Sequence, residues 1–165
     1  MAFAGAGLTG PLPHPHMAFM SDPFVIPQDP SAAAAIAGIA EDLSVFDDWM
    51  DRYQHIIDLG RALPPFPEAW MDEAHRIQGC QSKVWLAAAA RDGRLFLAGA
   101  SDAAIVSGLV ALLLRVYSGR VPAEILATPP EFLRDLGLIE ALSTNRGNGI
   151  AAMARRIAAL ARENA

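Results

Sequence analysis

Apolar residues recur with helical spacing from residue 46 to residue 57. The positions are Phe46, Trp49, Met50, Tyr53, Ile56 and Ile57. Steps of three and four residues place these side chains on one face, which predicts an amphipathic helix. Ser44 and Asp47 stand three residues apart, as in a capping box, and predict the start of this helix. Gly60 predicts its end.

From His75 onward the pattern changes to short apolar runs that are typical of strands. The runs are centred on Ile77 and on residues 84–86 and 95–97. Asp92-Gly93 separates the last two runs and predicts a tight hairpin turn. The sole cysteine, Cys80, falls between the first two runs and is therefore expected on a loop between strands.

The C-terminal half shows helical spacing again. Ser101 or Asp102 is expected to cap a first helix that ends at Gly119. A second helix is expected over residues 129–136, and a last one is led in by residues 145–149. The order of helix, three short antiparallel strands and several helices predicts an α+β fold with a small three-stranded antiparallel sheet packed against the helices.

Residues 1–40 differ from the rest of the chain. They are rich in glycine and proline, which break the periods of both helix and strand. We therefore expect residues 1–40 to be a largely disordered N-terminal extension and residues 41–165 to form the domain. His14 and His16 lie in this extension, and two histidines without further ligands do not make a metal site.

Composition excludes several classes of function. Hydrophobic residues make up 53% of the chain and charged residues 19%, which is too apolar for a disordered protein. The net charge of -5 predicts no nucleic-acid partner. No apolar run reaches the roughly 18 residues that span a bilayer, so no membrane partner is expected. The first basic residue is Arg52, and without a basic leader we expect a cytoplasmic location.

A single cysteine excludes an intramolecular disulfide and every CxxC motif. Three chemistries compete for Cys80. A hydrolase nucleophile needs a histidine base, but His75 is expected on the opposite face of an extended chain and His55 on a separate helix. Cluster ligation takes about four thiolate-type ligands, so no metal site is expected within one chain.

The third chemistry is sulfur exchange with a partner. It needs one accessible thiolate near a cation or backbone donors. Gly79 permits an unusual backbone angle or the close approach of another chain. The polar neighbours that can donate hydrogen bonds are Gln78, Gln81 and Ser82, and the nearby candidate cations are Arg76 and Lys83.

Three ordered blocks of sequence resemble one family. The first block is Ile77-Gln78-Gly79-Cys80-Gln81-Ser82-Lys83-Val84-Trp85, the second runs from Ser101 to Val106 and continues with Gly108-Leu109, and the third runs from Leu142 to Gly149. Together they resemble the SufE family of sulfur acceptor proteins, which includes CsdE, and the resemblance covers about residues 42–163. It implies a SufE-like, IscU-like fold.

The resemblance also implies a function. Members bind a PLP-dependent cysteine desulfurase of the SufS or CsdA type, accept persulfide sulfur on the loop cysteine, stimulate the desulfurase and pass sulfur toward iron–sulfur cluster assembly. Carried over, Cys80 is the acceptor, and we expect a partly sheltered loop because a persulfide is easily lost to water and oxidants. The chain needs no cofactor and has no independent turnover, because the PLP belongs to the desulfurase. An iron–sulfur scaffold complex is a further candidate partner.

The same resemblance assigns further site residues. Arg146 matches the family arginine that stabilises the thiolate or persulfide, and Gln78, Gly79, Gln81, Ser82 and Asp102 are expected to contact the partner. The third block departs from the common Pro-Ser-Arg-Ser, since this chain reads Thr144-Asn145-Arg146-Gly147. Gly147 and Gly149 are expected to loosen the first helical turn by about 1 kcal/mol each relative to alanine.

Two other functions stay open at this point. A regulatory module could activate the same desulfurase by docking alone, without carrying sulfur. A scaffold could instead share an iron–sulfur cluster across a dimer through Cys80.

Overall fold

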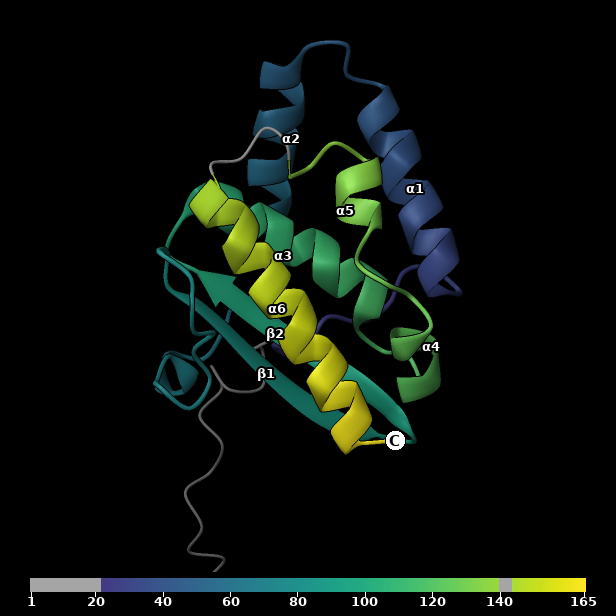
Figure 1. Cartoon of the computed structure of the whole chain (residues 1–165), viewed down its shortest axis with the longest axis vertical. Helices are drawn as coiled ribbons and strands as arrows, with labels where there is room; N and C mark the ends of the chain where they lie inside the picture. The colour runs from purple at the N-terminus through teal and green to yellow at the C-terminus, as the bar shows by residue number, and fades with distance from the viewer. Residues whose placement is uncertain (1–21, 140–143) are drawn as a thin grey trace, which may run out of the picture.

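The computed structural model describes residues 22–139 and 144–165, with the backbone alone for residues 144–147. Across these residues, longer helices and a β-hairpin build the domain together with several short turns of helix (Figure 1). The helices are α1 (Ala32–Ser44), α2 (Trp49–Arg61), η1 (Glu68–Trp70), α3 (Ala104–Tyr117), α4 (Pro122–Leu126), α5 (Phe132–Asp135) and α6 (Thr144–Glu163). The predicted α+β class is confirmed.

The sheet has two strands in the described part of the chain, so the expected third strand is wrong. β1 (Val84–Arg91) and β2 (Arg94–Ser101) pair antiparallel around the predicted Asp92-Gly93 turn. The segment before Cys80 reaches β1 only through an isolated bridge between Arg76 and Trp85. Pairing stops there because the chain turns away at Gly79, where φ is +87°, to form the cysteine loop.

Helix α3 lies at the centre of the fold and packs against α1, α2, α6 and β2 (Figure 1). Its apolar positions follow the predicted stripe and are nearly all inaccessible to solvent. The core face of the hairpin, formed by Val84, Leu86, Leu95 and Leu97, joins the same cluster. One core therefore supports both the hairpin and the last helix, the two elements that flank Cys80.

The packed domain begins before residue 41, contrary to the predicted boundary. Phe24 is buried, and the Val25 N–H donates to the Leu97 carbonyl at 2.8 Å. Buried Arg120 donates from Nη1 to the Asp29 carbonyl at 2.8 Å, and the Ser31 hydroxyl caps α1. The first two contacts join segments about 70 to 90 residues apart, so local periodicity does not reveal them. The prediction for residues 1–21 lies outside the described residues.

Helix boundaries differ from the predicted ones where capping residues were misassigned. Ser44 is the last residue of α1, and the Asp48 carboxylate caps α2 instead. Neither Ser101 nor Asp102 caps α3, whose N-cap is Ala103. The Asp102 side chain is engaged elsewhere, as described below.

The C-terminal helices also start at other residues than predicted. The helix expected over residues 129–136 is the short α5, which ends before Gly137 as predicted, and α4 precedes it unpredicted. Helix α6 begins at Thr144, so residues 145–149 lie inside it rather than leading into it. Gly149 thereby becomes a helical position that faces the rest of the protein.

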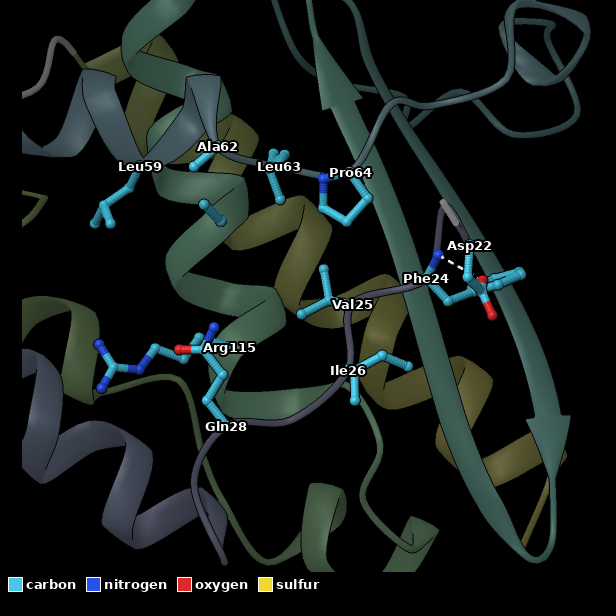
Figure 2. A pocket seen from close by; sticks show the side chains of 11 residues that line it. Asp22, Phe24, Val25, Ile26, Gln28, Leu59, Ala62, Leu63, Pro64 and Arg115 are labelled. Atoms are coloured by element: carbon cyan, nitrogen blue, oxygen red, sulfur yellow. Dashed lines mark hydrogen bonds between the residues drawn. The ribbon is translucent and has the colours of Figure 1, made fainter. Parts of the chain in front are cut away.

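An apolar cavity of 460 Å³ lies between three parts of the chain, which are residues 22–28, the C-terminal end of α2 and helix α3. Figure 2 shows Val25 and Ile26 on one side of it, and Leu59 of α2 and Leu63, which follows that helix, on the other. The guanidinium of Arg115 at its edge is already paired with Asp29 and Asp42. No described residue of the Cys80 loop lines this cavity, so it is separate from the thiol.

Helices α2 and α3 meet at Gly108, where their backbones come into direct contact. A Cβ built on Gly108 would lie 2.0 Å from the Ile56 carbonyl oxygen, which is backbone and cannot move aside alone. Only glycine permits this helix crossing.

We predict that Gly108→Ala lowers the free energy of unfolding by about 1–3 kcal/mol, because the two helices must separate to admit the methyl group. Urea denaturation followed by circular dichroism measures the change. Ala104→Ser is the control, since it adds one atom at an exposed position of the same helix and should change the stability little. A Gly108→Ala protein as stable as wild type would contradict this description of the crossing.

Candidate functional site around Cys80

Cys80 lies on the loop that joins the Arg76 bridge to β1. Its neighbours Gln78, Gly79 and Gln81 are exposed, whereas Cys80 itself is half-buried. No described atom lies within 4 Å of a Cβ built on Gly79, so the described part of the chain leaves the outer side of the loop open. The thiol therefore sits beneath an accessible loop, in agreement with the partly sheltered position expected for a persulfide carrier.

The inner side of the loop rests on helix α6 at Gly149. The Cys80 thiol donates a weak hydrogen bond to the Gly149 carbonyl, with 3.6 Å between sulfur and oxygen. A Cβ on Gly149 would lie 3.1 Å from that sulfur, closer than a normal contact. Ile150 and Met153 bury the same helical turn in the core. The missing side chain of Gly149 thus makes room for the thiol against a fixed helix.

The surroundings keep the thiol protonated at neutral pH. Burial raises the pKa of Cys80 above its usual value, and the positive charge of Arg76 lowers that pKa in part. The hydrogen bond to Gly149 also requires the proton, because a thiolate cannot donate. A reaction of Cys80 as a nucleophile therefore needs a change that exposes it or brings it further positive charge.

Asp102 holds the end of the cysteine loop. Its Oδ1 accepts the Lys83 backbone N–H at 2.9 Å, and its own N–H donates to the Lys83 carbonyl at 3.2 Å. The two bonds connect the loop to the segment that leads into α3. Asp102 is exposed as well, so its carboxylate is accessible from outside while it supports the loop.

The backbone of Arg146 lies in the first turn of α6, three residues before Gly149. That separation is one helical turn, an axial rise of about 4.5 Å. The described structure thus brings the backbone of the third sequence block beside the cysteine of the first. The side chain of Arg146 lies outside the described residues.

The remaining predicted site residues flank the thiol. Gln78 and Gln81 are exposed on either side of it, and Ser82 is half-buried. The residue that the sequence interpretation missed is Gly149, for which it predicted only a looser helical turn. A glycine within an apolar helical pattern is a signal of close approach, and here it is the contact with Cys80.

The described residues give no support to the hydrolase or metal chemistries. His75 Nδ1 lies 2.7 Å from Asp72, and the His75 ring stacks on Trp70, so this histidine is engaged away from the thiol. Within residues 22–139 and 144–165, no three His, Cys, Asp or Glu side chains are grouped so as to hold a metal ion. Over the same residues, no helix has the length and apolar character needed to cross a membrane.

Comparisons with a family model and with individual proteins agree on one family. The family model described as "SufE: Fe-S metabolism associated domain" matches residues 37–161. An uncharacterized SufE-like protein of Rhizobium meliloti is 42% identical over 124 residues, which cover 72% of this chain and 89% of that protein. An uncharacterized SufE-like protein of Synechocystis is 37% identical over 114 residues, 69% of this chain and 72% of its own length.

A solved structure shares the fold. The solution structure of a hypothetical protein from Thermus thermophilus superimposes with a TM-score of 0.66 at 25% identity, covering 79% of this chain and 95% of that one.

We predict that Arg76→Gln slows alkylation of Cys80 severalfold near neutral pH. Removing the positive charge raises the pKa of the thiol further and leaves less thiolate to react. Iodoacetamide labelling across a pH series, followed by intact mass, measures the rate.

Arg61→Gln is the matched control for this variant. Arg61 also pairs with an acid three residues away, Asp58, but its charge does not act on Cys80. Equal alkylation rates for wild type and Arg76→Gln at every pH would show that Arg76 has no electrostatic influence on the thiol.

Proposed function

The chain belongs to the SufE family, and on that premise we propose that it is a sulfur carrier that accepts persulfide sulfur on Cys80 from a PLP-dependent cysteine desulfurase of the SufS or CsdA type. The sulfur then goes to iron–sulfur cluster assembly, with a scaffold complex as the recipient. The observation that supports this best is the position of Cys80, half-buried against Gly149 on a loop whose outer side is exposed.

The proposed transfer is a thiol–persulfide exchange. The Cys80 thiolate attacks the terminal sulfur of the desulfurase persulfide, and a new bond forms from Sγ to that sulfur. The sulfur–sulfur bond of the donor breaks, and its electron pair returns to the donor cysteine as a thiolate. The step needs no oxidant or metal, and the chain itself supplies only the nucleophile and its surroundings. The PLP stays with the desulfurase.

Ionisation of Cys80 is the step that docking must promote. The free protein favours the neutral thiol, since burial raises its pKa. Moving the loop outward from Gly149 breaks the S–H···O contact and exposes the sulfur, which favours the thiolate. Arg76, four residues before Cys80, then stabilises the negative charge of the thiolate.

The roles of the flanking residues follow from the same proposal. Arg146, one turn before Gly149, is proposed to hold the thiolate or the persulfide anion once the loop has moved. Gln78, Gly79, Gln81 and Ser82 would form the surface that the desulfurase meets, and Asp102 would fix the end of that loop through Lys83.

The alternative is a regulatory module that activates the desulfurase by docking alone. Cys80→Ser distinguishes the two functions, because serine is nearly the same size as cysteine but cannot carry sulfur.

We expect Cys80→Ser to bind the desulfurase yet to lose nearly all stimulation of its turnover, measured as alanine released from cysteine. Ala90→Ser, which introduces the same residue at an exposed position near the far end of β1, is the control and should retain stimulation. If Cys80→Ser stimulates the desulfurase as wild type does, the protein acts by docking and the carrier proposal is wrong.

A further inference from the structure

A second depression opens beside the cysteine loop and is lined by arginines. It is a groove of 490 Å³ between residues 74–78 and the middle of α6. Arg76 contributes from the loop side, and Arg155 and Arg156 contribute from the helix. The other lining residues are Ala74, Ile77, Gln78 and Ala152.

The groove starts next to the thiol. Gln78 lies two residues before Cys80, and Ala152 lies one helical turn after Gly149, which the thiol contacts. Arg76 lines the groove and also lowers the pKa of Cys80, so its guanidinium charge reaches both. A molecule seated in the groove therefore lies next to the loop that carries Cys80.

The charge of the groove opposes that of the whole chain. The protein carries 18 acidic residues against 13 lysines and arginines, yet the groove has three arginines and no acid among its described lining residues. Arg76 pairs with Glu73 at 3.3 Å and Arg156 with Glu163 at 3.6 Å, both at exposed acids. Such surface pairs contribute little stability, so an incoming carboxylate can replace either acid.

Arg155 has no ion-pair partner among the described residues and is exposed. It lies six residues beyond Gly149, an axial rise of about 9 Å along the helix. Its guanidinium is therefore available to pair with an incoming carboxylate.

We propose that the Arg76–Arg155–Arg156 groove is the docking site for an acidic segment of the protein that delivers sulfur to Cys80. The proposal rests on the carrier function and extends it to the chemistry of the partner surface. A protein segment suits the groove because its arginines are spread along an open surface, where charges steer association and set orientation. A segment held along α6 would bring the donor's active site to the adjacent cysteine loop.

The test is a charge reversal, Arg155→Glu, with Arg134→Glu as the matched control. Arg134 is an exposed arginine on α5 outside the groove. Each variant is titrated calorimetrically with a purified SufS-type or CsdA-type desulfurase at low and at physiological salt. We expect Arg155→Glu to raise the Kd about tenfold and to reduce its salt dependence, while Arg134→Glu changes the Kd less than about twofold. Arg155→Lys should recover most of the affinity.

The acidic character of the partner segment has its own probe. A hexaglutamate peptide should compete with the desulfurase for wild type and much less for Arg155→Glu. Unchanged Kd values for Arg155→Glu, or no competition by the peptide, would overturn the docking proposal.

The intact mass of the protein, measured in the same mixtures, tests the carrier function independently of the docking proposal. If wild type takes up sulfur and Arg155→Glu binds as tightly as wild type, the groove proposal fails and the function stands. If wild type binds the desulfurase through the groove but never gains mass, the carrier function fails and the docking site stands.

Discussion

The contact between Cys80 and Gly149 is the constraint on which the site depends. It places the only cysteine of the chain against the backbone of α6, at a position where a Cβ would lie 3.1 Å from the sulfur. The helix cannot yield easily, because Ile150 and Met153 of the same turn are buried in the core. The half-burial of the thiol, its raised pKa and the approach of the α6 backbone to the loop all follow from this contact.

The same contact limits where an added sulfur atom can lie. A persulfide lengthens the side chain by one sulfur–sulfur bond, about 2 Å, and the sulfur already touches the Gly149 carbonyl. A second sulfur on Cys80 therefore cannot extend toward Gly149 and must lie in another direction. On the outer side, no described residue approaches Gly79 within 4 Å, and the neighbours of Cys80 along the loop are exposed. In the proposed function, shelter in the free protein and exposure on docking are two positions of this loop.

Sequence reasoning predicted what local patterns control. The Asp92-Gly93 hairpin turn and the apolar stripe of α3 depend on neighbouring residues and were predicted correctly. The helix α1 was missed because its alanine-rich turns show little contrast between faces, and it is held by distant partners such as Glu124, which accepts the Ala32 N–H.

The site was predicted less completely, for the same physical reason. That Cys80 lies on a loop could be predicted, since Gly79 and the flanking apolar runs are local signals. Its contact with Gly149 spans 69 residues, and the groove joins Arg76 to Arg155, so neither follows from spacing along the chain. The prediction of a third strand was wrong as well, because an apolar residue such as Ile77 does not reveal where pairing with β1 will stop.

The most direct measurement is the intact mass of the protein after incubation with a purified cysteine desulfurase and cysteine. The account predicts an added mass of about 32 Da, one sulfur atom, located on Cys80 by peptide mapping and removed by a reducing thiol. A competent desulfurase that binds the protein and turns over cysteine, yet leaves the mass of Cys80 unchanged, would contradict it.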